Sequence, residues 1–249
     1  MSIFRKGPVT APVQAAPVAP SGMLSLRKTA AVSLKKNGLE VDGSGGIAVY
    51  LVLDHSGSMQ GHYSKGNVQR ITEQVLALAV EIDSDGEVPV FYFGTDVSKP
   101  VIVSIKDPRS PAYYLGWVDR THRKVAWGAT DYKKTIKAVA KYHAKHGGGQ
   151  PGLVIFQTDG SPGTFGPGDD RENARQALRD VSPQNLFFSF VGFGPKSQVE
   201  FLFELDEITG RVRDNASAFH AVDPQRTRDS DLYDGILGEF TKEWLPQVL

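Results

Sequence analysis

Oxygen-bearing side chains crowd into one short turn of this 249-residue sequence. Asp54, Ser56 and Ser58 alternate within the run DHSGS, directly after an apolar stretch. Alone, this run is equally well explained as a turn whose side-chain oxygens accept backbone hydrogen bonds and cap a helix. Two further segments carry matching oxygens, with Thr130 in GATD and Asp159 in TDG. Together the three segments supply two carboxylates and three hydroxyls, a set of hard oxygen ligands.

Such a ligand set predicts a Mg²⁺ site rather than a zinc or copper site, with Mn²⁺ and Ca²⁺ as alternatives. Mg²⁺ demands near-octahedral geometry and keeps several waters. Ser56, Ser58 and Thr130 are therefore expected to contact the ion, while Asp54 and Asp159 hold its waters. Neutral direct ligands leave the ion much of its positive charge. An open position is then expected to accept a carboxylate from a partner.

The apolar pattern predicts the elements that position these residues. Continuous apolar runs predict strands over residues 47–53, 88–93, 101–105, 153–158, 186–193 and 216–222. Helical spacing predicts helices over residues 68–82, 132–143, 170–180, 198–208 and 229–245. The alternation predicts an α/β fold, with a doubly wound, mostly parallel sheet, helices on both faces and one short antiparallel edge strand. Ligands bind such sheets beyond the carboxyl ends of the strands, where all three oxygen-bearing segments are expected.

Composition excludes several classes of protein. The 28 basic and 28 acidic residues balance, which argues against a nucleic-acid or membrane-surface binder. No apolar run approaches the roughly 18 residues of a spanning helix, so no membrane span is predicted. The chain has no cysteine, which excludes disulfides, zinc–thiolate sites and cysteine nucleophiles. A cytoplasmic location is compatible with this and is the predicted one.

The charge is unevenly distributed along the chain. Residues 1–46 hold six basic and two acidic residues, a net charge of +4, so the remainder carries −4. Residues 1–22 are rich in Pro, Ala and Val and lack periodicity, which predicts a disordered tail. Prolines interrupt this segment and leave no apolar core for a signal peptide. Residues 23–45 are interpreted as a short segment or linker before the main domain, residues 46–249.

The three oxygen-bearing segments resemble the metal-ion-dependent adhesion site (MIDAS) of von Willebrand factor type A domains. All five motif positions are filled in matching order, and the resemblance covers residues 46–249. It implies a Rossmann-like von Willebrand A fold and a non-enzymatic module whose metal captures an acidic side chain of a protein partner. In related adhesion domains, ligand binding is coupled to movement of the C-terminal helix, here about residues 229–245.

The surrounding sequence, with LSLRK and VSLKK upstream, also resembles bacterial tellurium-resistance proteins that join a fragment of a D-type domain to a von Willebrand A-like domain. This implies a role in tellurite or stress resistance, with other tellurium-resistance proteins as partners. Residues 23–45 are too short for a full D-type domain and lack its acidic calcium-binding signature, so calcium binding does not carry over. Without cysteine, thiol-based tellurite reduction by this chain is disfavoured.

Two other functions stay open on the residues alone. A flavodoxin-like binder can cradle a phosphate in a Ser/Gly-rich loop after its first strand, although Asp54 would repel that phosphate unless a cation intervenes. A metal-assisted phosphatase could position a phosphoryl group with Asp54, Asp159 and Mg²⁺. No nucleophile–base arrangement and no Gly-x-Ser-x-Gly motif accompanies these residues.

Four neighbouring features are interpreted with less specific roles. His55 lies inside the motif at a position the family does not use as a ligand, which favours a structural role. Trp127 either braces the Thr130 loop or contacts a partner. The lysines of residues 133–145 form a helical face that is either solvated or a docking surface for phosphate or an acidic partner. The glycine-rich loop of residues 161–168 is expected to influence partner choice.

Overall fold

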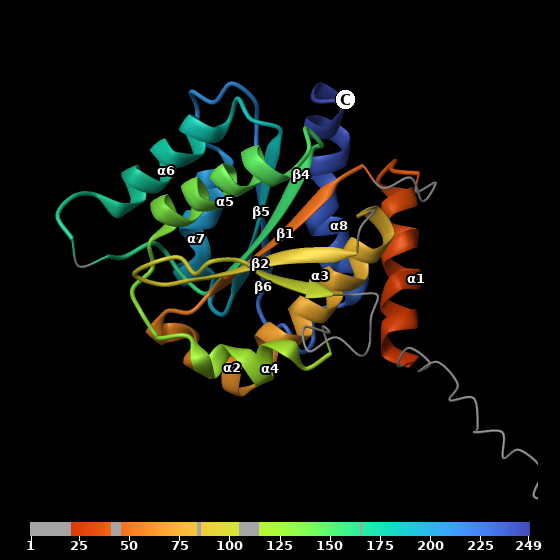
Figure 1. Ribbon diagram of the computed structural model, residues 1–249, viewed down its shortest axis with the longest axis horizontal. Helices are drawn as coiled ribbons and strands as arrows, with labels where there is room; N and C mark the ends of the chain where they lie inside the picture. Colours follow the sequence, from red (N-terminus) through yellow and green to blue (C-terminus); the bar gives the residue numbers. More distant parts are fainter. Residues whose placement is uncertain (1–20, 41–45, 84–85, 105–114, 165) are drawn as a thin grey trace, which may run out of the picture.

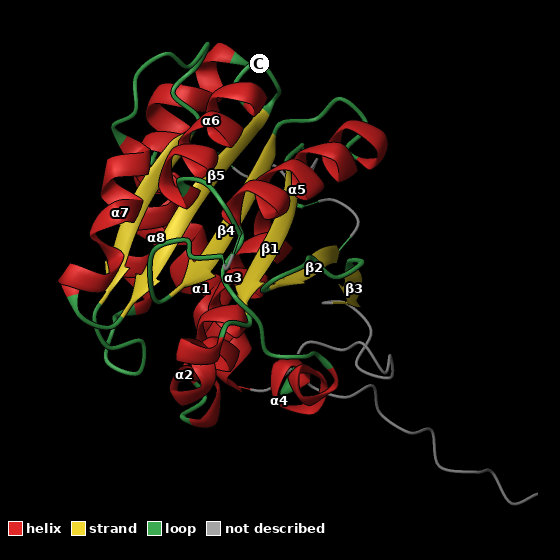
Figure 2. Ribbon diagram, turned by 90° about the vertical axis from the view of Figure 1, so that its left-hand side faces the viewer, coloured by secondary structure: helices red, strands yellow, loops and turns green. Residues whose placement is uncertain are grey.

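One six-stranded sheet forms the centre of the part of the chain that the computed structural model describes, which is residues 21–40, 46–83, 86–104, 115–164 and 166–249. The strands are β1 (Ala48–Asp54), β2 (Glu87–Phe93), β3 (Val101–Ser104), β4 (Gly152–Thr158), β5 (Leu186–Phe193) and β6 (Ala216–Ala221). Their order is β3-β2-β1-β4-β5-β6. Every neighbouring pair is parallel except β2 and β3, which are antiparallel at the edge (Figure 2).

The sheet grows in opposite directions from its middle. The chain passes from β1 to β2 and β3 on one side, and from β4 to β5 and β6 on the other. β1 and β4 are therefore neighbours at a topological switch point, and Leu53 pairs with Gln157 near their carboxyl ends. This register places Asp54 beside Thr158.

Helices cover both faces of the sheet (Figure 1). One face packs against α1 (Ser21–Lys36), α3 (Asn67–Ile82), α4 (Trp117–Thr121) and α8 (Asp229–Glu239). The other face packs against α5 (Tyr132–His146), α6 (Asp170–Val181) and α7 (Lys196–Asp206). The short α2 (Gln60–Ser64) follows β1 and a 3₁₀ turn, Gly57–Met59. Because both faces are covered, β4 and β5 are buried at every position.

The predicted fold class is confirmed, including the antiparallel edge strand. The C-terminal helix differs from its predicted extent, because α8 ends at Glu239. The chain continues as a π-helical turn, Phe240–Trp244, and a 3₁₀ turn, Leu245–Gln247. No helix among the described residues is long and apolar enough to cross a membrane.

Helix α1 was not predicted, and it lies within the segment interpreted as the end of the tail and a short segment or linker. It packs beside α3 and α8, although α8 is about 200 residues away in the sequence (Figure 1). Lys36 forms an ion pair with Asp234 of α8, and Asn37 Nδ2 donates to the same carboxylate at 3.1 Å. Thr241 Oγ1 donates to the Asn37 carbonyl at 2.8 Å. The predicted tail otherwise falls in residues 1–20, outside the described residues.

Candidate metal centre

Asp54, the last residue of β1, forms the buried base of the candidate site. Its Oδ1 accepts a hydrogen bond from the Ser56 backbone N–H at 2.7 Å, as in the turn that the sequence offered as an equally good explanation of this run. Its Oδ2 accepts from Thr158 Oγ1 at 2.7 Å. Tyr132 in turn donates to that threonine oxygen at 3.0 Å. Asp54 is fully buried, so its carboxylate can act on an ion only from the interior side of the site.

A chain of oxygens leads from this base to the surface. Ser56 Oγ lies 3.1 Å from Ser58 Oγ, and Ser58 Oγ donates to Asp159 Oδ1 at 2.8 Å. Adjacent ligands of an octahedral Mg²⁺ ion, with metal–oxygen distances of about 2.1 Å, are about 2.9 Å apart. The spacing of the two serine oxygens therefore fits one edge of a magnesium coordination shell, and Asp159 bonds to one of these two oxygens. Ser58 is exposed and Asp159 nearly buried, so the chain opens outward at Ser58.

Backbone pairing positions Thr130 next to these oxygens. Ser56 and Gly128 form a parallel bridge, with the Gly128 N–H donating to the His55 carbonyl at 3.1 Å. Thr130 and Gly163 exchange backbone hydrogen bonds of 2.9 and 3.0 Å. The Thr130 segment is thus held between the turn after β1 and the loop after β4. The Thr130 hydroxyl forms no hydrogen bond with another described residue and is available to a ligand.

Gly128 permits this close approach. A Cβ atom built there would lie 2.5 Å from the Thr95 backbone nitrogen and 2.9 Å from its Oγ1. Such distances are far below van der Waals contact, so any side chain at residue 128 would push the Thr130 segment away from β2. By contrast, a Cβ atom at Gly163 would meet nothing within 4 Å.

All five predicted site residues therefore lie at the carboxyl edge of the sheet. Asp54, Ser56, Ser58 and Asp159 are linked by hydrogen bonds, and Thr130 is brought beside them by its backbone. Their metal-binding role stays a prediction. In the described part of the chain no cluster of three or more His, Cys, Asp or Glu residues is arranged to hold a metal, so the hydroxyls are essential to this set.

Burial controls the electrostatics of the site. It raises the pKa of Asp54 from 3.8 to about 7, against the hydrogen bonds from Thr158 and Ser56, which favour the charged form. The negative charge of Asp159 adds to the increase. A cation between these carboxylates would counter both effects by stabilising their ionised forms.

An aromatic cluster packs against the loop that carries Thr130. The His55 ring stacks on the Trp127 ring with centroids 3.7 Å apart and an angle of 9° between their planes. His55 is fully buried, its Nδ1 faces the Ala126 carbonyl at 3.2 Å, and burial lowers its pKa. These contacts agree with a structural role for His55. Trp127 braces the loop through this stack, and its side chain is also 39% exposed, so it can touch a partner.

Sequence reasoning gave no role to three residues that build the site. Thr158 and Tyr132 orient Asp54, and Gly128 allows the loops to meet. A signal existed for Thr158, because it is a polar residue that ends an otherwise apolar strand beside Asp159. The importance of Tyr132 depends on its contact across the sheet edge, which the sequence does not reveal.

Comparisons with known proteins found a matching family model and a related bacterial protein. A family model described as "vWA found in TerF C terminus" matches residues 46–248. A Bacillus subtilis (strain 168) protein named "Uncharacterized protein YcbR" is 32% identical over 205 residues, covering 80% of this chain and 78% of that protein.

Two solved structures share the fold at low sequence identity. The PilB minor pilin from Streptococcus sanguinis aligns with a TM-score of 0.56 and 13% identity, over 82% of this chain and 63% of the other. A von Willebrand factor type A protein from Catenulispora acidiphila aligns with a TM-score of 0.52 and 17% identity, over 79% of this chain and 42% of the other. The chain therefore spans less than two thirds of the length of either solved chain.

Proposed function

Because the chain belongs to the vWA-TerF-like family, we propose that its site at the carboxyl edge of the sheet binds Mg²⁺ and captures an acidic side chain of a protein partner. Mn²⁺ and Ca²⁺ are the alternative ions. Ser56, Ser58 and Thr130 contact the ion, and Asp54 and Asp159 hold its waters. In this proposal the protein is a non-enzymatic binding module that is located in the cytoplasm.

One observation carries the proposal, namely the spacing of the surface oxygens. Ser56 Oγ and Ser58 Oγ lie 3.1 Å apart, close to the edge of an octahedral shell, and Asp159 Oδ1 accepts from Ser58 Oγ at 2.8 Å. The hydroxyls carry no charge, so the bound ion stays electropositive. An anionic oxygen from outside is then the most favourable ligand for an open position.

The geometry gives less support to the phosphate-binding and phosphatase alternatives. The Ser56 backbone N–H, which a phosphate-cradling loop would offer to its ligand, is already bonded to Asp54. Asp54 is fully buried and accepts hydrogen bonds from Thr158 and Ser56, so a phosphoryl group does not contact it directly. His55 faces the Ala126 carbonyl and stacks on Trp127, so it is not directed at Ser56 or Ser58 as a base.

We propose further that the partner belongs to a bacterial tellurite or stress resistance system. Support comes from the description of the matching family model, which places this kind of domain at the C terminus of TerF. A pull-down from stressed cells with and without chelator tests this step. Partners of that system are expected only when the divalent ion is present, and identical recovery with chelator would contradict a metal-bridged interaction.

Isothermal titration calorimetry with Mg²⁺ tests the metal site itself. Ser58→Ala and Thr130→Ala each remove a direct ligand, and binding is expected to weaken at least about tenfold. Ser64→Ala is the matched control, because this exposed serine lies six residues after Ser58 and its hydroxyl donates to the Gly61 carbonyl of its own helix. Undiminished Mg²⁺ binding in both ligand variants would overturn the proposed site.

A further inference from the structure

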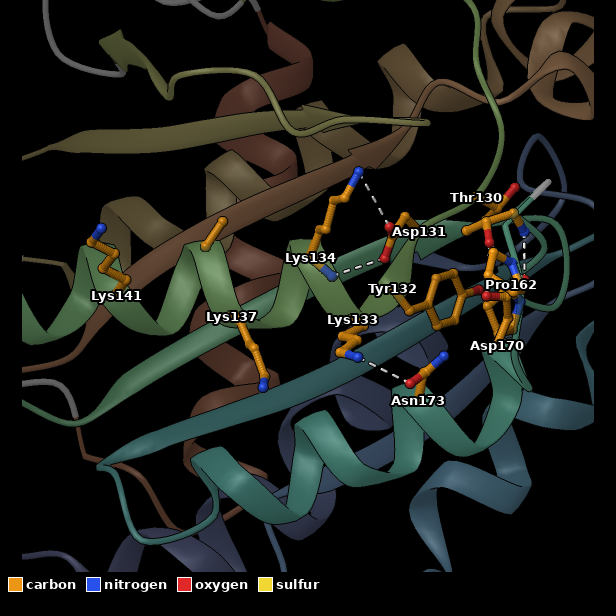
Figure 3. Close-up of a pocket in the computed structure, with 13 residues that line it drawn as sticks. Thr130, Asp131, Tyr132, Lys133, Lys134, Lys137, Lys141, Pro162, Asp170 and Asn173 are labelled. Atoms are coloured by element: carbon orange, nitrogen blue, oxygen red, sulfur yellow. Dashed lines mark hydrogen bonds and ion pairs between the residues drawn. The ribbon is translucent and has the colours of Figure 1, made fainter.

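A cleft of about 510 Å³ opens directly beside Thr130 (Figure 3). One side is the outer face of α5, and the other is the loop after β4 together with the start of α6. In Figure 3, Thr130 and Pro162 lie at one end of the cleft and Lys141 lies at the other. The cleft is therefore elongated along α5 and begins at the candidate metal site.

The metal site and the cleft share one piece of backbone. Thr130 lines the cleft, and its backbone is paired with Gly163 of the loop that forms the opposite side. A partner chain that offers a carboxylate to a metal at Thr130 can therefore continue along the cleft. The cleft offers this chain a concave path, and Ala138 and Pro162 are part of its apolar lining.

Positive charge along the cleft exceeds the negative charge. Lys133 donates to the neutral amide oxygen of Asn173 at 3.0 Å, and Lys141 has no partner among the described residues. Lys134 and Lys137, which also line the cleft, form ion pairs with Asp96 and Asp180 outside it. Lys133 and Lys141 thus form no ion pair within the described residues, although the charge of Lys133 also lowers the pKa of Asp180.

Two carboxylates, Asp131 and Asp170, line the cleft beside its four lysines. Asp131 caps α5 by accepting from the Lys134 backbone N–H at 2.9 Å, and its carboxylate also lies 3.6 Å from the Lys134 ammonium. Asp170 accepts from the backbone N–H of Thr164 at 2.6 Å and from its hydroxyl at 2.8 Å. Both acids keep their negative charge, but the four lysines outnumber them, so the lining of the cleft carries a net charge of +2.

The spacing of Lys133 and Lys141 along α5 indicates the shape of a ligand that pairs with both. Eight residues of helix separate Lys133 from Lys141, which is about 12 Å at 1.5 Å per residue. Two lysines anchored this far apart favour an elongated anion over a compact one such as phosphate. An extended peptide covers the same distance with about four residues, so carboxylates at several positions along it can be paired.

We propose that this cleft binds an extended acidic peptide segment of the partner, adjacent in sequence to the side chain that completes the metal site. The proposal rests on the proposed function, because the metal defines where the segment enters. The metal supplies one strong contact, and Lys133 and Lys141 select for further carboxylates several residues away. Partners with an isolated acidic residue are then bound more weakly than partners with an acidic run.

Fluorescence anisotropy with a labelled octaglutamate peptide in Mg²⁺ tests the cleft. The variant Lys133→Gln/Lys141→Gln is expected to bind this peptide about five- to tenfold more weakly than the wild type. The control Lys28→Gln/Lys145→Gln removes the same charge from exposed lysines of α1 and α5 that do not line the cleft. The control is expected to bind like the wild type.

Three results would overturn the cleft proposal. The first is that the two double variants bind the peptide equally well. The second is that a wild type that binds Mg²⁺ in calorimetry does not bind octaglutamate. The third is that inorganic phosphate displaces the labelled peptide as effectively as unlabelled peptide does. Failure of the metal site is distinguishable. In that case the wild type takes up no Mg²⁺, while any remaining peptide binding still depends on Lys133 and Lys141.

Discussion

At the scale of single residues, Asp54 combines two roles that the sequence presented as alternatives. Its carboxylate closes a local turn with Ser56, and the same contact holds it on the interior side of the Ser56 and Ser58 hydroxyls. A turn-forming aspartate and a residue that supports a metal are therefore compatible in one side chain. The cost is a buried acid whose pKa is raised to about 7.

The raised pKa predicts a pH dependence of folding in chelated buffer. Because the folded protein holds the Asp54 proton more tightly than the unfolded chain, this group stabilises the fold below about pH 4. The contribution disappears as the pH rises through about 7. The wild type should lose up to about 4 kcal/mol relative to Asp54→Asn across this range, since one pKa unit corresponds to about 1.4 kcal/mol.

Urea unfolding between pH 4 and pH 8 measures the difference. Asp206 has a pKa of about 7 for similar reasons and is unchanged in both proteins, so its effect cancels in the comparison. Mg²⁺ is expected to restore stability to the wild type at pH 8 and much less at pH 5. Parallel pH profiles of wild type and Asp54→Asn would refute the assignment.

The sequence predicted that five residues would lie at one edge of the sheet, but not how they are held there. Residue types and strand ends were sufficient for Asp54, Ser56, Ser58, Thr130 and Asp159, because the carboxyl ends of neighbouring parallel strands share one edge. Thr158 and Tyr132 act through contacts between elements. Such contacts depend on side-chain packing, which spacing along the chain does not encode.

At the scale of elements, the buried strands were predictable and α1 was not. The strands are continuous apolar runs, whereas the inward face of α1 relies on Met23 together with the small or isolated side chains Ala30 and Leu34. Leu24 and Val32 are apolar but exposed, which blurs the helical stripe. The docking of α1 is therefore a tertiary effect that a periodicity argument misses.

A pair of substitutions in α1 tests its contribution to stability. Leu34 is fully buried, so Leu34→Ala should lower the free energy of unfolding by about 2–4 kcal/mol. Val32 is 68% exposed on the same helix, and Val32→Ala should change it by less than about 0.5 kcal/mol. Equal effects in urea unfolding would show that α1 does not dock as described.

The loop that carries Thr130 gives a second test at this scale. Gly128→Ala forces a methyl group toward the Thr95 backbone, so Mg²⁺ affinity should fall at least about tenfold as Thr130 is displaced. Gly163→Ala is the matched control, because its methyl group enters open space while the backbone pair with Thr130 is kept. Calorimetry that finds the same affinity for both variants would contradict this account.

At the scale of the whole molecule, α8 links two regions that are remote in sequence. Its Asp229 accepts from Gln74 of α3 at 2.6 Å, and its Asp234 is held by Lys36 and Asn37 from α1 and the turn after it. Movement of the C-terminal helix, as implied by the resemblance to adhesion domains, would have to break these contacts. That coupling stays a prediction.

Hydrogen exchange measures this coupling. If occupation of the site displaces α8, amides of residues 232–244 should exchange faster when Mg²⁺ and octaglutamate are both bound, because the contacts of Asp229 and Asp234 are lost. The same amides in Mg²⁺ alone provide the reference. Exchange that is unchanged by the peptide, despite binding, would mean that the C-terminal helix is a fixed part of this module.

The stack of Trp127 on His55 also gives the protein an intrinsic optical reporter. Of the three tryptophans in the chain, Trp117 and Trp244 are almost completely buried, so their fluorescence has little access to solvent. Trp127 is the partly exposed one, and it lies three residues from Thr130. Emission quenched by a soluble iodide salt therefore comes mainly from this indole, and a ligand that covers the loop can be followed without a label.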